Sequence, residues 1–234
     1  MSELAKPILE GEGNSDYERY LRTDALLALQ KTSDEWIHRD ELLFQSVHQT
    51  SEIWLKLAWN EVEEATRLVN SGDVGGALRL LRRATDCFKL VTSALDMLEH
   101  MSPWEYTEIR KVLGHGSGFD SPGFRNIRRV SPSLGEAFDA LRREEGLSLV
   151  ELYVRGSEFE ELYQVAEGLI EWDERISVWR FRHYKVVARV IGDEVVGTQG
   201  TPVELLSGLI KNKLYPELWQ VRNDLTARAK EEEG

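Results

Sequence analysis

The stretch HRDELLFQSVHQTSEIWLKL, residues 38–57, decides the fold class. Its apolar and small side chains recur every three or four residues and form one stripe, made of Leu43, Phe44, Val47, His48, Ser51, Trp54 and Leu55. This spacing is typical of an amphipathic helix. The pattern predicts one long helix over residues 39–70, ended by the polar turn at Asn70-Ser71-Gly72-Asp73.

The same period returns along most of the chain. We expect further helices over residues 17–32, 74–100, 134–146, 157–190 and 203–231, the last either whole or broken at Pro216. Another helix should begin at Ser102-Pro103, with Ser102 as N-cap and Glu105 completing a capping box. The sequence contains no convincing alternating strand pattern and no internal repeat. We therefore predict an all-α fold, a bundle of long helices.

Three segments fall outside the helical pattern. Residues 1–15 are polar, which predicts a flexible N-terminal arm before a single helical domain at residues 16–234. The segments GHGSGFDSPGF (114–124) and GDEVVGTQGTP (192–202) are glycine-rich loops. Glycine allows a backbone to approach a ligand closely, although neither loop has the spacing of a phosphate-binding loop.

The composition indicates a soluble, cytoplasmic protein. The 234 residues carry 29 basic and 41 acidic side chains, a net charge of −12, which gives no electrostatic reason to bind nucleic acid. The single cysteine, Cys87, excludes an internal disulfide and the c-type haem attachment motif. No apolar run resembles a signal peptide or reaches the ~18 residues of a membrane span. We expect neither nucleic acid nor membrane as a partner.

Two of the five histidines lie within apolar stripes on different expected helices. His48 follows Phe44 by one turn, and His183 follows Trp179 by one turn. A single histidine in such a stripe is more often a core residue with a satisfied hydrogen bond. Two of them, in a chain with seven tryptophans, favour a cofactor pocket.

Haem is the simplest cofactor that two separated histidines could serve. A zinc site needs three or four clustered ligands, and the sequence has no HExxH motif and no cysteine pair. A di-iron bundle needs a repeated Glu-x-x-His motif, which is not offered here. Haem needs one strong axial ligand, for which neutral imidazole is common. Cys87 as a thiolate ligand is less favoured, because a lone cysteine in a helix is mostly a small buried hydrophobe.

Arg110 is a candidate for binding a carboxylate. It lies one turn after Tyr106 on the same helical face. An arginine can hold a carboxylate through two parallel hydrogen bonds. The alternative is an ordinary surface salt bridge, which an acidic protein offers to most of its arginines.

Four blocks in order resemble the tryptophan 2,3-dioxygenase family, from about Tyr17 to Trp219. They are YERYLRTDALLALQ (17–30), HRDELLFQSVHQTSEIWLKL (38–57), EYTEIRKVLGHGSGFDSPGFR (105–125), and WRFRHYKVVARVIG (179–192) followed by GTQGT (197–201). The resemblance implies a haem b enzyme that inserts O2 across C2–C3 of the indole ring of L-tryptophan and gives N-formylkynurenine. It also implies an all-helical fold around the haem.

The resemblance implies roles for individual residues. His183 is similar to the proximal ligand of the haem iron, and His48 to the distal histidine that faces the indole N–H. Phe44 resembles a wall of the indole pocket, Arg110 the clamp on the substrate carboxylate with Tyr106 beside it, and Thr198 a contact to the amino-acid end.

Further implied roles concern the cofactor and a second subunit. Ser117 and Gly118 resemble loop contacts near the haem, and Trp179 lies on the cofactor side, one turn before the proximal histidine. Tyr17 and Tyr20 resemble a pair that reaches into the pocket of a neighbouring subunit. The resemblance therefore implies a homo-oligomer, a tetramer or a dimer.

Two departures from the family pattern leave the reaction open. The stretch between Arg125 and WRFRH is much shorter than the pattern implies, and GTQGT replaces the usual GTGGS, with Gln199 in place of a glycine. Ring cleavage of tryptophan competes with insertion of one oxygen at indole C2 of tryptophan or a substituted tryptophan. A haem-binding protein without turnover is a third possibility, although it would need no amino-acid clamp.

Overall fold

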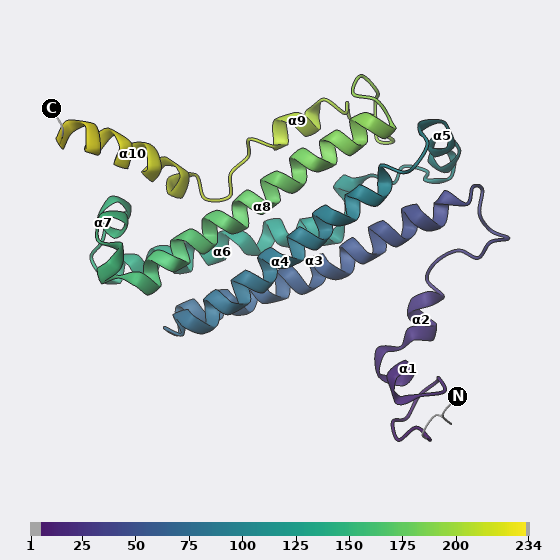
Figure 1. The fold of residues 1–234 in the computed structure, drawn as a ribbon, viewed down its shortest axis with the longest axis horizontal. Helices are drawn as coiled ribbons and strands as arrows, with labels where there is room; N and C mark the ends of the chain where they lie inside the picture. Colours follow the sequence, from purple (N-terminus) through teal and green to yellow (C-terminus); the bar gives the residue numbers. More distant parts are fainter. Residues whose placement is uncertain (1–5, 233–234) are drawn as a thin grey trace.

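Four long helices carry the architecture of this protein: α3 (Asp40–Asn70), α4 (Val74–Leu98), α6 (Pro122–Glu144) and α8 (Glu160–Val190). In the computed structural model, which describes residues 6–232, α3 packs along α4 and α6, and α4 packs along α8 (Figure 1). Within that range there is no strand, and a single isolated bridge joins Val196 and Pro202. The all-α prediction is confirmed.

Shorter helices flank the four long ones. They are α1 (Asp16–Leu21), α2 (Thr23–Leu27), α5 (Pro103–Val112), α7 (Leu149–Val154), α9 (Leu205–Leu209) and α10 (Pro216–Glu232), with short 3-10 turns at Gly118–Asp120 (η1) and Gly156–Glu158 (η2). The break near Pro216, one of the two expected forms of the C-terminal segment, separates α9 from α10.

The main core lies where α3, α4, α6 and α8 meet. Phe88 and Trp172 are fully buried there and pack edge to face, with ring centroids 5.1 Å apart. The indole Nε1 of Trp172 donates to Ser131 Oγ at 3.0 Å, so the polar atom of the largest core side chain is satisfied.

Three helices differ from the sequence pattern. The expected helix over residues 17–32 is instead two short helices, α1 and α2, parted at Arg22, whose φ of 54° is left-handed. Helix α6 starts at Pro122, well before residue 134, because Ser121 Oγ accepts from Phe124 N at 3.1 Å and caps the helix. Pro132 inside α6 had concealed this continuity. Helix α8 starts at Glu160, after the separate turns α7 and η2.

The predicted capping box at the start of α5 is wrong. Helix α5 does begin after Ser102 with Pro103 in its first turn, but the Ser102 side chain accepts no capping hydrogen bond. The Glu105 carboxylate lies beside His38 instead, with Oε1 3.5 Å from Nε2. Glu105 thus contacts the side chain of His38 and not the backbone N–H of Ser102, as the capping box would require.

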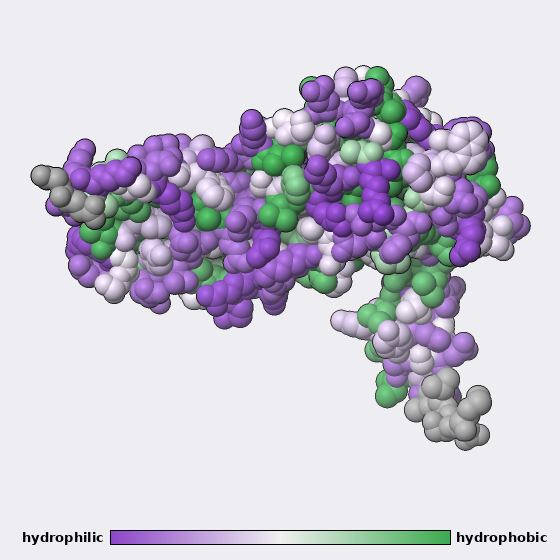
Figure 2. Space-filling model, turned by 45° about the horizontal axis from the view of Figure 1, so that its top comes forward, coloured by the Kyte–Doolittle hydropathy of each residue, from purple (hydrophilic) through white to green (hydrophobic). Residues whose placement is uncertain are grey.

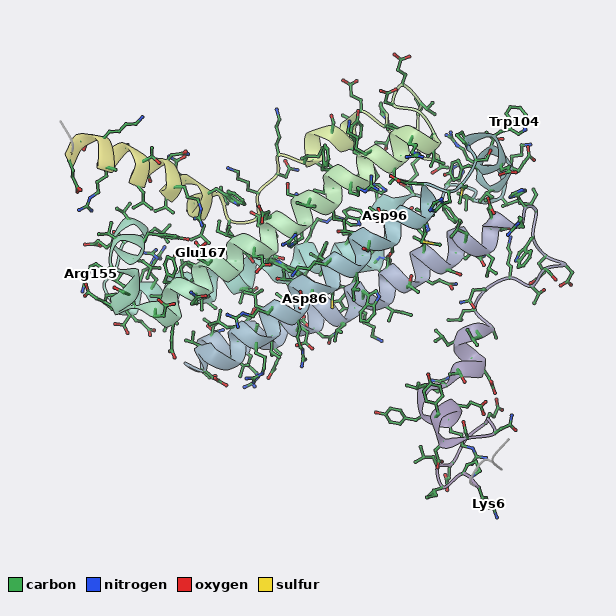
Figure 3. All side chains as sticks on the ribbon, viewed as in Figure 1. Lys6, Asp86, Asp96, Trp104, Arg155 and Glu167 are labelled. Atoms are coloured by element: carbon green, nitrogen blue, oxygen red, sulfur yellow. The ribbon has the colours of Figure 1, made fainter. Side chains whose placement is uncertain are left out.

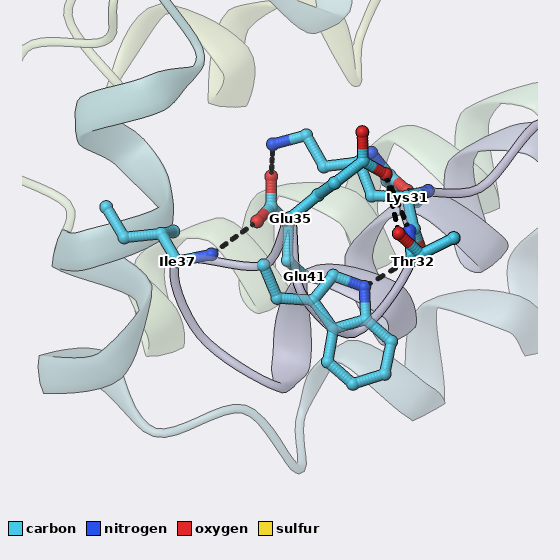
Figure 4. Close-up of polar contacts among 7 residues, drawn as sticks. Lys31, Thr32, Glu35, Ile37 and Glu41 are labelled. Atoms are coloured by element: carbon cyan, nitrogen blue, oxygen red, sulfur yellow. Dashed lines mark hydrogen bonds and ion pairs between the residues drawn. The ribbon is translucent and has the colours of Figure 1, made fainter.

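The N-terminal segment, α1 and α2, projects from the end of the bundle (Figure 1). The linker that joins it to α3 is held by Glu41, which is buried and accepts from Ile37 N at 3.0 Å (Figure 4). The Lys31 ammonium pairs with the other oxygen of the same carboxylate. A single buried acid therefore fixes the linker to the first turn of α3.

The C-terminal helix is tied to α8 by two carboxylates. Asp173 is buried and accepts from Leu214 N at 2.9 Å and Trp219 Nε1 at 2.8 Å. Glu167, labelled in Figure 3, accepts from Tyr153 Oη at 2.6 Å and also binds Arg222 of α10.

The face shown in Figure 2 is mainly hydrophilic, with apolar side chains gathered in places, including on the projecting N-terminal segment. Among residues 6–232, no helix has the length and apolar character needed to cross a membrane.

Candidate functional site

Helices α3 and α8 bring the two stripe histidines to one region. The pKa of His183 is lowered to about 4, mainly by burial and to a smaller extent by repulsion from a positive charge on His48. Desolvation by the surrounding protein atoms also lowers the pKa of His48, against smaller opposing effects of the Phe44 carbonyl and the Glu52 carboxylate, although the residue as a whole is exposed to solvent. Both imidazoles are therefore neutral at pH 7 and lie within electrostatic reach of each other.

The proton position on His48 follows from its hydrogen bond. His48 Nδ1 lies 2.7 Å from the carbonyl oxygen of Phe44, one turn earlier. Because a carbonyl only accepts, the neutral ring carries its proton on Nδ1 and leaves Nε2 as an acceptor. The Phe44 ring lies against the imidazole, with centroids 4.1 Å apart.

The His183 ring is held in place by aromatic neighbours. Its ring stacks on Trp179 at 4.8 Å and 9°, and Trp179 packs on Phe124 at 4.0 Å, so the ring plane is fixed. Among residues 6–232, the buried Trp179 Nε1 beside this ring has no hydrogen-bond acceptor. A fixed, neutral imidazole next to an unsatisfied N–H is suited to a bound cofactor.

Helix α5 forms another wall of this region. Tyr106 is buried, and its ring centroid lies 6.1 Å from that of Phe44. A second hydrophobic cluster contains Tyr106 and Val186 and also takes in Phe44 and Trp179. Burial raises the pKa of Tyr106, against a smaller effect of Arg110, so its hydroxyl stays protonated.

The fold joins the two glycine-rich loops beside α5. Arg110 donates to the carbonyl oxygen of Val196, and Thr198 Oγ1 donates to the carbonyl oxygen of Gly116. Gln199 Nε2 donates to Asp120 Oδ2 at 2.6 Å. Two loops whose bonded residues are 79 and 82 positions apart in sequence therefore meet next to the candidate carboxylate clamp.

The first loop has an ordered end. Ser117 caps η1: its Oγ accepts from Phe119 N at 3.3 Å, and its own N donates to Asp120 Oδ2 at 3.1 Å. Gly118 follows as the first residue of η1, with open space where a Cβ would be. Both predicted loop residues thus lie in the segment that the second loop contacts.

Tyr17 and Tyr20 are not brought to this region within one chain. Both lie on α1, which projects away from the bundle, and they are 69% and 79% exposed (Figure 1). The other predicted site residues, on α3, α5, α8 and the two loops, gather at one end of the bundle.

Glu52 is a residue of this region that the sequence analysis missed. It lies one turn after His48 on α3 and binds the start of α6, where Gly123 N donates to its Oε2 at 2.8 Å and Ser121 Oγ donates to its Oε1. Its charge partly offsets the desolvation that lowers the pKa of His48. In the sequence, Glu52 could have been found from its position four residues after His48, on the same helical face.

A second group of possible metal ligands lies elsewhere. His38, Asp40 and Glu105 place their ligand atoms within 4.8 Å of one another, at the start of α3 and α5. In this arrangement Asp40 N donates to His38 Nδ1 at 3.2 Å, which accounts for the orientation of the ring. None of the three belongs to the set around His48 and His183.

Comparison with known proteins places these residues in a family. The family model described as Tryptophan 2,3-dioxygenase matches residues 3–136. The tryptophan 2,3-dioxygenase of Caulobacter vibrioides is 32% identical over 89% of this chain and 98% of its own length. Those of Bacillus thuringiensis subsp. konkukian and Ruegeria pomeroyi are 30% and 31% identical, over 91% and 96% of this chain and 93% and 100% of their own lengths.

The alignments also bear on the length of the chain. The alignment with the Bacillus thuringiensis relative spans 263 positions, whereas 91% of 234 residues is about 213. About 50 alignment positions therefore have no counterpart here. With matches along nine tenths of its length, this chain belongs to the tryptophan 2,3-dioxygenase family.

Proposed function

We propose that this protein is a haem-dependent oxygenase that inserts O2 across C2–C3 of the indole ring of L-tryptophan and forms N-formylkynurenine. The observation that carries the proposal is the approach of two neutral histidines, His48 and His183, beside an arginine that can bind a carboxylate. The relatives named above, which are tryptophan 2,3-dioxygenases, support the same substrate and reaction.

The residues around His183 fit haem b. Its low pKa keeps the imidazole neutral and able to donate a lone pair to iron, without competition from a proton at pH 7. Stacking on Trp179 fixes the orientation of the ring, and the unpaired Trp179 Nε1 offers a donor to the cofactor side. His183 would hold the iron, while Trp179, Ser117 and Gly118 would line the haem. When bound, haem supplies the iron that binds and activates O2.

His48 would orient the indole ring. Because its Nδ1 proton is engaged by the Phe44 carbonyl, Nε2 is available to accept the indole N–H. The Phe44 ring would pack against the indole and restrict its tilt. The neutral state of His48 at pH 7 matters here, since a protonated imidazole could not accept this hydrogen bond.

The amino-acid end of the substrate would lie near α5 and the loops. Arg110 would bind the carboxylate, with the hydroxyl of Tyr106 beside it and Thr198 closing from the second loop. In the present structure Arg110 and Thr198 donate to main-chain carbonyls, so each would exchange one acceptor for another when substrate binds. Binding energy at this remote end would hold C2–C3 of the indole in a fixed place.

The projecting N-terminal segment supports a homo-oligomer, as either a tetramer or a dimer. Tyr17 and Tyr20 expose most of their surface, as do Leu27 and Leu29, and such an apolar surface is stabilised when a second copy covers it. We propose that α1 and α2 pack on a neighbouring subunit near its substrate pocket, while residues 16–234 form one helical oxygenase domain. A cytoplasmic location accords with the single cysteine and the acidic charge.

The mass of the product tests the proposal. The full chain is loaded with haem, reduced, and given L-tryptophan and O2, with 18O2 in a parallel sample. A product heavier by two oxygen atoms, formed without further reductant, supports ring cleavage. A gain of one oxygen, only with added reductant, would show a monooxygenase, and no product despite bound haem would show a haem-binding protein without turnover.

A further inference from the structure

The end of the second glycine-rich loop is braced from within. Gly197 N donates to the carbonyl oxygen of Thr201 at 2.8 Å, and Gly200 N donates to the carbonyl oxygen of Gly197 at 3.0 Å. Gly200 has φ +78°, a backbone conformation that favours glycine. We call residues 197–201 the tip. Because these hydrogen bonds are internal, they hold the five residues of the tip together as one unit.

Three hydrogen bonds hold the tip and its flank against the rest of the site, donated by Arg110, Thr198 and Gln199. Under the proposed function, Arg110 and Thr198 must leave their main-chain acceptors to bind substrate. The hydrogen bond from Gln199 to Asp120 involves no group assigned to the substrate. It is therefore the contact that can persist while the other two change partners.

The acceptor of this bond, the Asp120 carboxylate, is held in place by a second hydrogen bond. Asp120 Oδ2 also accepts from Ser117 N at 3.1 Å, within the cap of η1, so the carboxylate does not have to be ordered by Gln199. A charged acceptor strengthens a hydrogen bond relative to a neutral one. Gln199 therefore gains a stable anchor on the first loop.

We propose that Gln199 is a positioning residue whose bond to Asp120 latches the tip over the amino-acid end of the substrate. The inference rests on the proposed function for the roles of Arg110 and Thr198, whereas the latch itself can be measured without turnover. Loss of the latch lowers the population of the closed tip, which raises KM for tryptophan and leaves kcat nearly unchanged.

The test compares Gln199→Ala with the haem-loaded wild-type chain. Amide hydrogen exchange across residues 197–201 should become about three- to tenfold faster, and KM for L-tryptophan should rise by a similar factor, as expected for one lost hydrogen bond. Glu194→Ala is the matched control, because this exposed side chain at the base of the same loop makes no hydrogen bond within residues 6–232. It should change neither quantity.

Moving the negative charge from residue 120 to residue 199 makes the test specific to this pair of residues. Gln199→Glu opposes two carboxylates and should loosen the tip further. Adding Asp120→Asn removes one of the two opposed charges and gives the pair an N–H donor again, so protection and KM should return toward the wild-type values. A merely structural role for Gln199 would not produce this rescue.

The outcomes separate the latch from the proposed function. Unchanged exchange and KM in Gln199→Ala, or no rescue in the double variant, would overturn the latch even if the enzyme cleaves tryptophan normally. If the wild-type protein fails to convert tryptophan while the exchange pattern follows the four variants as expected, the proposed function fails and the latch remains.

Discussion

Gly123→Ala tests how closely the start of α6 packs against α3, the helix that carries His48. Gly123 lies in the first turn of α6, where a Cβ would meet Leu55 Cβ, Leu55 Cδ1 and Glu52 Oε2 of α3, each at 2.7 Å. An ordinary contact begins at 3.4 Å, so the two helices must separate by about 0.7 Å. Leu55 Cβ is attached directly to the α3 backbone and cannot move aside by changing rotamer.

The expected effect follows from two opposing contributions. Overpacking a buried contact costs about 1–3 kcal/mol, and replacing a helical glycine by alanine returns up to about 1 kcal/mol. The free energy of unfolding should fall by about 1–2 kcal/mol, which lowers Tm by about 2–8 °C in a chain of this size. Turnover should fall as well, because Glu52, which influences His48, is displaced.

The assay is thermal and urea unfolding of the haem-loaded protein, together with N-formylkynurenine formation. Gly75→Ala in α4 is the matched control, since a Cβ at this exposed position meets nothing within 4 Å. It should raise the free energy of unfolding by about 0.5–1 kcal/mol and leave turnover unchanged. If Gly123→Ala is as stable as Gly75→Ala, the close approach of α6 to α3 is wrong.

Four further predictions concern three side chains. His48→Ala should slow turnover about ten- to hundredfold while the haem spectrum persists, whereas loss of haem would contradict the assignment. The reaction needs the neutral His48 ring, whose pKa is lowered. The acid limb of the kcat/KM profile should therefore have its midpoint below about 6.5, the ordinary pKa of histidine, and a midpoint above that value would contradict the lowered pKa. Arg110→Ala should raise KM about tenfold or more and also lower kcat, because the carboxylate clamp helps to hold the indole in place; an unchanged KM would contradict the clamp. Asp173→Ala strands three donors of Leu214, Tyr215 and Trp219 and should cost about 3–5 kcal/mol in urea unfolding, with a loss under about 1 kcal/mol contradicting this.

The long helices were predictable because their periodicity is local. The stripe from Leu43 to Leu55 continues in α3, and the stripe through Trp179 and His183 continues in α8, as the pattern indicates. Helix α6 was predicted only in its second half, because a proline in mid-helix resembles a terminus until packing against α3 outweighs its cost. The capping box at Ser102 failed because Glu105 faces His38, a residue that local spacing cannot place.

The candidate site divides in the same way. The residue types and the family resemblance named His48, His183 and Arg110 without any structure. The contact of Gln199 with Asp120, and that of Glu52 with the start of α6, became visible only in three dimensions. Each joins segments that are about 70 to 80 residues apart, and no periodicity in one segment specifies which side chain of another it will meet.

By itself, the sequence determined the helical class, the two histidine-bearing stripes and the family. These depend on residue spacing within one helix or on short ordered motifs, both of which are properties of contiguous chain. Only the tertiary structure decided that the histidines are neutral, that His48 carries its proton on Nδ1, and that the two glycine-rich loops meet. Desolvation and hydrogen-bond partners come from side chains that packing brings together, so these properties exist only once the helices have assembled.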